Sequence, residues 1–121
     1  MRQATDAYRT VAKEIASPRD LEADLLLKAA ARMQAVSDSW TRDQSDFGEA
    51  LTYNRKLWTI FLDSITSPDN LLPAEIRQNI SNLGVFIMNQ TVSAMSNPRP
   101  EALRSLININ RELAAGLLGR A

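Results

Sequence analysis

The sequence contains no histidine and no cysteine among its 121 residues. Histidine is the commonest general base and metal ligand in proteins, and cysteine is the other main ligand of zinc and iron sites. Because both are missing, we expect no catalytic residues, no bound metal and no other cofactor, and we expect the protein not to be an enzyme. Without cysteine there can also be no disulfide, so the chain lacks the covalent links typical of small secreted domains.

The sequence also lacks an excess of charge of either sign, with 14 basic and 14 acidic residues. Nucleic-acid binding depends largely on a positive surface, so we expect no direct nucleic-acid partner. With only four glycines, there is no glycine-rich phosphate loop. Residues 43–48 resemble a calcium loop, but Phe47 stands where an oxygen ligand is required. The acidic residues Asp20, Glu22 and Asp24 are expected to form a solvated helix face.

Long apolar runs are absent too, and none approaches the roughly 20 residues needed to cross a bilayer. Near the start, Arg2, Asp6 and Arg9 interrupt any apolar core of a signal peptide. We therefore expect a cytoplasmic protein with no membrane contact. The length is that of one ordinary domain, which we place over residues 1–121.

Apolar residues recur at three- and four-residue spacing, in segments separated by prolines or polar breaks, and nowhere alternate as in a strand. The first segment carries an apolar stripe of Ala4, Tyr8, Val11, Ala12 and Ile15, and the second a stripe that begins at Leu21. The sequence therefore predicts an all-α fold, a compact bundle of five helices over residues 3–16, 18–40, 46–66, 73–96 and 100–118. The third, apolar over more than half its circumference, is expected to be central.

The fourth predicted helix carries two apolar stripes. The first is expected to be core, with Gly84 allowing close helix approach, and consists of Ile76, Ile80, Leu83, Gly84 and Ile87. The second, offset stripe consists of Val85, Met88, Val92 and Met95. It is explained either by a helix buried on two sides or by an exposed groove whose flexible methionines suit an amphipathic partner helix. These four residues are our candidate partner-binding surface.

Two asparagines stand where the helical pattern calls for apolar residues. Asn54 lies in the apolar stripe of the third helix and Asn110 in that of the fifth. Both are expected to be buried and hydrogen-bonded, either as polar pins that fix helix register or, alternatively, as ligand contacts. Trp58 is expected to be a core anchor. With Gly84, these residues form the predicted structural core.

Several short motifs are not specific one by one, but their order and spacing along the chain are characteristic. They are residues 17–23 (SPRDLEA), 54–59 (NRKLWT), 70–73 (NLLP), 82–84 (NLG), 106–110 (LININ) and 115–117 (AGL), and they are preceded by the single residue Tyr8. In these motifs the chain resembles the FlaF family of flagellar biosynthesis regulators, and the resemblance covers nearly the whole sequence.

The resemblance implies a helical cytoplasmic protein that binds flagellin, supports its production and export as a secretion chaperone or adaptor, and acts beside the regulator FlbT. An alternative that the resemblance leaves open is post-transcriptional control of flagellin synthesis, exerted on flagellin mRNA through FlbT. The expected partners are thus flagellin and, as a further candidate, FlbT. Flagellin termini are amphipathic helices, which fits an apolar docking surface.

Overall fold

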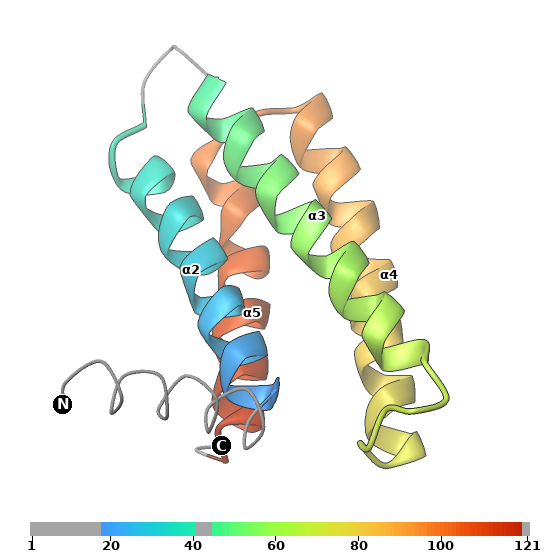
Figure 1. Cartoon of the computed structure of the whole chain (residues 1–121). Helices are drawn as coiled ribbons and strands as arrows, with labels where there is room; N and C mark the ends of the chain where they lie inside the picture. Colours follow the sequence, from blue (N-terminus) through green and yellow to red (C-terminus); the bar gives the residue numbers. More distant parts are fainter. Residues whose placement is uncertain (1–17, 41–44, 120–121) are drawn as a thin grey trace, which may run out of the picture.

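The computed structural model describes residues 18–40 and 45–119, and all of its regular structure is helical. The elements are α2 (Pro18–Asp38), α3 (Ser45–Thr66), α4 (Ala74–Ser96), the 3₁₀-helix η1 (Pro100–Leu103) and α5 (Arg104–Leu117) (Figure 1). The described residues contain no strand, so the predicted all-α fold is confirmed. The predicted helix over residues 3–16 lies outside the described residues.

Prolines set the ends of α4 and the start of the last helix, as the sequence predicts. Pro73 is the N-cap of α4 and not its first helical residue. After α4, residues 97–99 leave the helix, because proline has no amide hydrogen and disfavours helical geometry in the residue before it. Pro100 then starts a 3₁₀ turn, and the α-helix begins only at Arg104. The predicted span 100–118 is therefore two elements.

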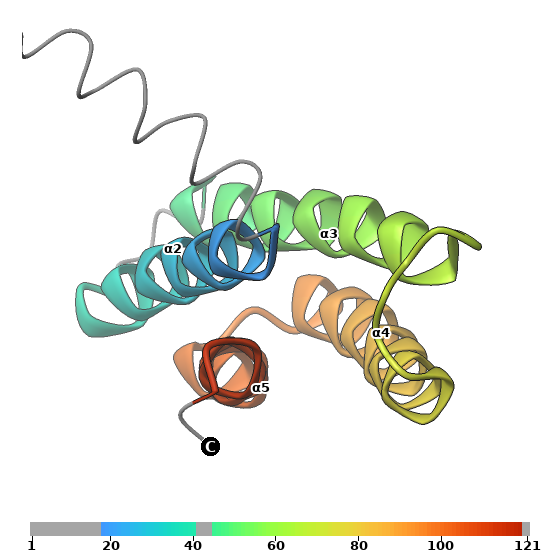
Figure 2. The same ribbon diagram turned by 60° about the horizontal axis from the view of Figure 1, so that its bottom comes forward.

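Consecutive helices run in opposite directions and associate in two pairs. α2 packs most extensively against α5, and α4 packs chiefly against α3, while α2 and α3 join the pairs (Figures 1 and 2). The expectation that the third predicted helix is central is therefore only partly met, because α3 packs against α2 and α4 but α5 packs mainly on α2. Part of the apolar surface of α3 also faces outwards, since Ile60 is 69% exposed.

The core lies between the two pairs and is built mainly from large aliphatic side chains around Trp58. Trp58 is fully buried and meets Phe61 edge-on, with ring centroids 5.6 Å apart, an arrangement that aromatic rings favour. The other large apolar side chains with almost no exposure are Leu26, Met33, Leu51, Ile65, Ile87, Leu103 and Leu106.

Two residues that the periodicity assigned to buried stripes are exposed instead. Leu21 is 52% and Ile76 is 44% exposed. Both lie in the first turn of their helix, at the same end of the bundle (Figure 1). A helical pattern identifies the face that points inward, but it does not reveal whether a neighbouring helix is long enough to cover the residues of a terminal turn.

Candidate partner-binding surface

The position of α4 is fixed by one face, which packs on α3. Its buried residues follow one another at three- and four-residue spacing: Ile80, Gly84, Ile87, Thr91 and Ala94. At the centre of this face a Cβ on Gly84 would lie 2.6 Å from both terminal methyl carbons of Leu62 and 3.0 Å from its Cγ. Glycine therefore lets the two helices approach closely, as the sequence predicts for this position.

The four candidate partner-binding residues, hereafter the Val/Met stripe, lie along one border of the buried face. Val85 is 62% exposed, Val92 66% and Met95 42%. Met88 is half-buried and packs against the core. Of the two explanations that the sequence left open, burial of α4 on two sides does not hold for the described residues, since three of the four side chains are open to solvent.

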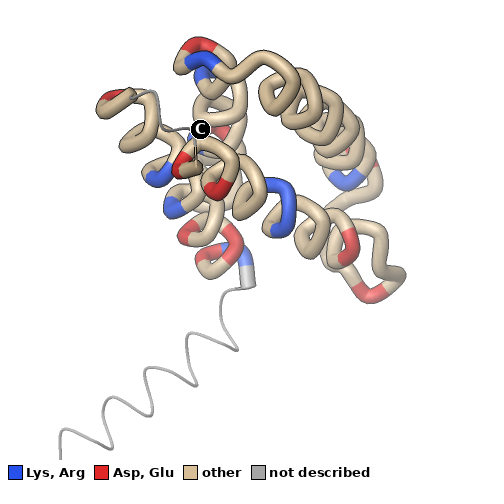
Figure 3. Tube along the Cα trace, turned by 90° about the horizontal axis from the view of Figure 1, so that it is seen from above, with Lys and Arg blue, Asp and Glu red and all other residues tan. Residues whose placement is uncertain are grey.

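After Arg77, the rest of α4 carries no charged residue. Between Arg77 and Arg99 the sequence contains no acidic or basic residue, and α4 is correspondingly almost without coloured segments in Figure 3. Interface centres are depleted of charged residues because removing charge from water is costly. A partner could therefore cover this part of α4 without burying a charge of α4.

Several polar side chains of α4 are hydrogen-bonded within the helix itself. The hydroxyl groups of Ser81 and Ser96 donate to the carbonyl oxygens of Arg77 and Val92, at 2.9 and 3.0 Å. The Gln78 side-chain amide donates to Asn82 Oδ1 at 3.0 Å. Polar groups that already have partners lose less when water is displaced. This lowers the desolvation cost of docking.

A shallow cleft of about 570 Å³ adjoins the Met95 end of the stripe. It lies mainly over the first half of α3 and is lined by Arg32, Ser45, Gly48, Glu49, Thr52, Tyr53, Lys56 and Met95. The Arg32 guanidinium stands 4.5 Å from the centre of the Tyr53 ring, a cation–π contact. The Val/Met stripe is therefore bordered at this end by polar and charged side chains. Protein interfaces commonly have such a polar rim around an apolar centre.

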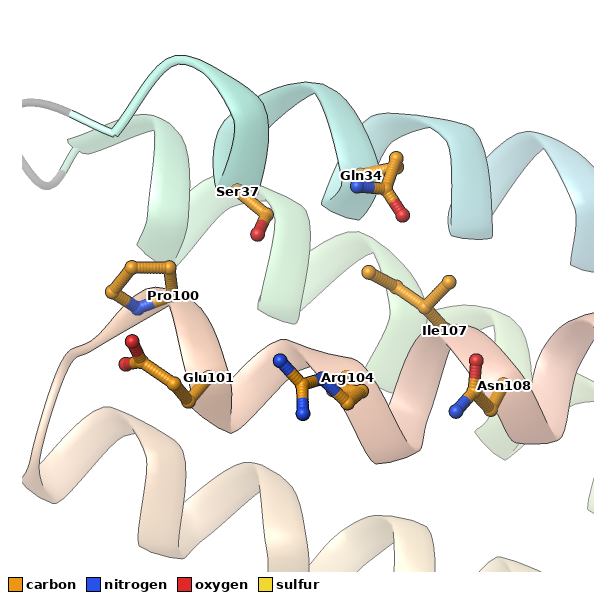
Figure 4. A pocket seen from close by; sticks show the side chains of 7 residues that line it. All are labelled: Gln34, Ser37, Pro100, Glu101, Arg104, Ile107 and Asn108. Carbon is orange, nitrogen blue, oxygen red and sulfur yellow. The ribbon is translucent and has the colours of Figure 1, made fainter.

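A second cleft, of about 240 Å³, lies between α2 and the start of α5 (Figure 4). Gln34 and Ser37 of α2 face a row of side chains across it: Pro100, Glu101, Arg104, Ile107 and Asn108. This cleft could not be predicted from the sequence, because the two segments are more than 60 residues apart and neither carries a recognisable motif. Its lining is mostly polar and contains one charge of each sign.

The two buried asparagines and Trp58 form one hydrogen-bonded group, the asparagine cluster, where α2, α3 and α5 meet. Trp58 Nε1 donates to Asn110 Oδ1 at 2.9 Å. Asn110 Nδ2 donates to Asn54 Oδ1 at 2.7 Å and to the Leu26 carbonyl oxygen at 3.2 Å. Both asparagines are fully buried, as the sequence analysis expected. Asn54 Nδ2, by contrast, has no hydrogen-bond partner among the described residues.

A family model described as "Flagellar protein FlaF" matches residues 4–117. The chain belongs to the FlaF family. The family resemblance seen in the sequence motifs is thereby confirmed. The matched range includes the whole Val/Met stripe, Gly84 and the asparagine cluster, and membership of the family makes this a flagellum-related protein. No curated protein and no solved structure matches the chain.

Two further features bear on the expectations for this FlaF-family chain. No three acidic residues within the described ranges come together closely enough to hold a metal ion, and none of the described helices could span a membrane.

The acidic residues near the start of α2 are not all exposed to solvent, contrary to the sequence prediction. Asp20 and Asp24 are exposed, but Glu22 is half-buried. Burial raises the pKa of the Glu22 carboxyl, and the nearby Arg19 charge opposes this.

Proposed function

We propose that this protein binds flagellin in the cytoplasm through the Val/Met stripe of α4 and supports flagellin production and export as a chaperone or adaptor. The role proposed is one of binding and not of catalysis. The observation that carries the proposal is an exposed apolar stripe on a helix that has no charge between Arg77 and Arg99. Membership of a flagellar family supports a flagellar protein as the partner, and flagellin offers amphipathic helices of the kind that such a surface accepts.

The size of the stripe supports reversible binding. Full burial of a valine or methionine side chain contributes roughly 1.5–3 kcal/mol, of which Val85 and Val92 have more than half still to gain and Met95 somewhat less than half. Association itself costs of order 4–15 kcal/mol. Because the gain from these side chains does not exceed this cost, the stripe by itself supports only weak, reversible binding, which is compatible with the release of flagellin for export.

The test is the affinity of the purified protein for purified flagellin, measured by calorimetry. Val92→Asp places a charge in the stripe, and loss of one buried valine should weaken binding about 10- to 100-fold. Met88→Asp should act in the same direction. Ser93→Asp is the matched control, because it adds the same charge at the adjacent exposed position, outside the stripe. We expect it to change the affinity less than about threefold.

Two results would contradict the proposal. Unchanged affinity of Val92→Asp and Met88→Asp for flagellin, with circular dichroism showing intact helices, would exclude the stripe as the binding surface. Absence of flagellin binding by the unaltered protein would exclude the function itself. Binding of flagellin mRNA by the protein alone in a gel shift, weakened by salt, would instead support direct action on the transcript.

A further inference from the structure

The Val/Met stripe leads into the shallow cleft over the first half of α3, hereafter the Tyr53 cleft. α4 ends beside the start of α3 (Figure 1), and Met95 belongs both to the stripe and to the lining of this cleft. Val85 and Met95 are ten residues apart in sequence, which corresponds to about 15 Å along a helix, or nearly three turns. A partner helix that covers the stripe and continues for one turn beyond Met95 therefore lies over the Tyr53 cleft.

The Tyr53 cleft carries an excess of positive charge. Two cationic side chains line it, Arg32 of α2 and Lys56 of α3, against one carboxylate, that of Glu49. None of the three forms an ion pair with another of the described residues. Both cations are therefore available to an acidic group that enters the cleft from outside.

The arginine of the cleft is held in place by an aromatic ring. Arg32 Cζ lies 4.5 Å from the centre of the Tyr53 ring. A guanidinium that is stacked on a ring keeps the N–H groups of its edge free, and these groups match the two oxygens of a carboxylate. Lys56 follows Tyr53 by three residues and therefore lies on the same side of α3. The two cations thus stand on either side of Tyr53, ready to receive a carboxylate.

The other end of the stripe offers no comparable site. The nearest charged residue there is Arg77, eight residues before Val85 and thus about 12 Å away along the helix. Its side chain is half-buried, and its Nε donates a hydrogen bond to the Leu72 carbonyl oxygen at 3.1 Å. The charges around the stripe are therefore unequally distributed between its two ends.

We propose that the Tyr53 cleft receives the carboxylate side chains of an amphipathic partner helix, which covers the Val/Met stripe and carries its acidic residues one turn beyond its own apolar face. The inference rests on the proposed function only in taking the stripe as the surface that the partner covers. It adds the chemistry that the partner needs. It also fixes the direction in which the partner lies, because apolar contact alone does not distinguish the two directions, whereas complementary charge does.

The test uses the full-length protein and two synthetic amphipathic peptides of about 18 residues, long enough for five helical turns. The peptides share the same apolar face. The turn beyond that face carries two glutamates in the first peptide and two lysines in the second. Fluorescence anisotropy at low salt measures both affinities. We expect the acidic peptide to bind about tenfold more tightly, as two solvent-exposed charge pairs should give, and the difference to shrink at about 1 M salt.

Three variants separate the charge of the cleft from the apolar contact. Lys56→Glu reverses one charge at an exposed position and should bind the basic peptide at least as tightly as the acidic one. Arg104→Glu is the matched control, because it makes the same change of charge at an exposed position of α5 that does not line the Tyr53 cleft. It should alter the preference less than about twofold. Val92→Ala should weaken both peptides alike, by about three- to tenfold.

Equal affinity of the unaltered protein for the two peptides at low salt would overturn the proposal. A preference that Lys56→Glu leaves unchanged, with helices intact by circular dichroism, would overturn it as well. A dimer of the protein alone at about 10 μM that is lost in Val92→Asp would make a second copy the occupant of the stripe, again against the proposal.

Failure of the proposed function is a separate result. Neither peptide is derived from flagellin, so a protein that prefers the acidic peptide but does not bind flagellin would support the inference and exclude flagellin as the partner. A protein that binds flagellin but shows no preference between the peptides would do the reverse. Absence of binding to either peptide would overturn the inference, and with it the stripe as a surface for helices.

Discussion

The asparagine cluster predicts a marked difference between two mutations that delete the same atoms. Asn54→Ala and Asn110→Ala each remove a fully buried carboxamide, so the two mutations delete the same side-chain volume. Asn110 accepts a hydrogen bond from Trp58 and donates to Asn54 and to the Leu26 carbonyl. Asn54 takes part in only one of these bonds, and its Nδ2 has no partner among the described residues.

The magnitude follows from the groups left without partners. Asn110→Ala leaves Trp58 Nε1 and Asn54 Oδ1 buried and unpaired, and each such group costs about 1–3 kcal/mol. Asn54→Ala leaves Asn110 Nδ2 with its bond to Leu26 and removes the unpartnered Nδ2 of Asn54. We therefore expect Asn110→Ala to lower the free energy of unfolding by about 2–4 kcal/mol more than Asn54→Ala, out of a total of about 5–15 kcal/mol.

Urea denaturation, followed by circular dichroism and by Trp fluorescence, measures this difference. With an m-value of about 1–3 kcal/mol/M, the midpoint of Asn110→Ala should lie roughly 1–2 M below that of Asn54→Ala. Equal midpoints at equal m-values would refute the reasoning, because they would mean that the volume removed, and not the pairing of polar groups, decides the cost.

Three further results are expected. Gly84→Ala should destabilise the protein by up to about 2 kcal/mol, because overlap with the Leu62 side chain costs about 1–3 kcal/mol and alanine regains about 1 kcal/mol of helix propensity. Combination with Leu62→Ala should remove the overlap in a double-mutant cycle. Trp58→Phe keeps an aromatic ring but removes the indole N–H that donates to Asn110 Oδ1. It should lower the free energy of unfolding by about 1–3 kcal/mol. Because burial raises the pKa of Glu22, the folded state binds this proton more tightly than the unfolded state, and stability falls as pH rises through the folded pKa. Glu22→Gln should therefore raise the melting temperature at pH 7 and change it little at pH 3, where the wild-type carboxyl is protonated in both states.

The helices of the described residues could be predicted from the sequence because their limits depend on local chemistry. Pro73 and the prolines after Ser96 restrict the backbone wherever they occur, so the structure places the ends of α4 within one residue of the prediction. The inward faces followed from the 3.6-residue period, and the burial of Asn54 and Asn110 followed from their place within it.

The pairing of the helices could not be read from the sequence in the same way. An amphipathic pattern identifies the buried face but not the helix that covers it, so neither the packing of α5 on α2 nor the exposure of Leu21 and Ile76 was predicted. The bond between Trp58 and Asn110 joins residues 52 positions apart. The sequence indicated only that Trp58 and Asn110 both lie on the inward faces of their helices, and not that they are hydrogen-bonded to each other.

The uncharged surface of α4 has a kinetic consequence. Proteins that meet through oppositely charged patches associate at up to 10⁸–10⁹ M⁻¹s⁻¹ at low salt, whereas uncharged patches meet at about 10⁵–10⁶ M⁻¹s⁻¹. A complex formed on α4, with no charge between Arg77 and Arg99, should therefore assemble nearer the slower rate, with a salt dependence that comes from the charged rim at the Met95 end and not from α4. Its affinity would be set by how long the partners remain together, and its heat capacity of binding should be negative.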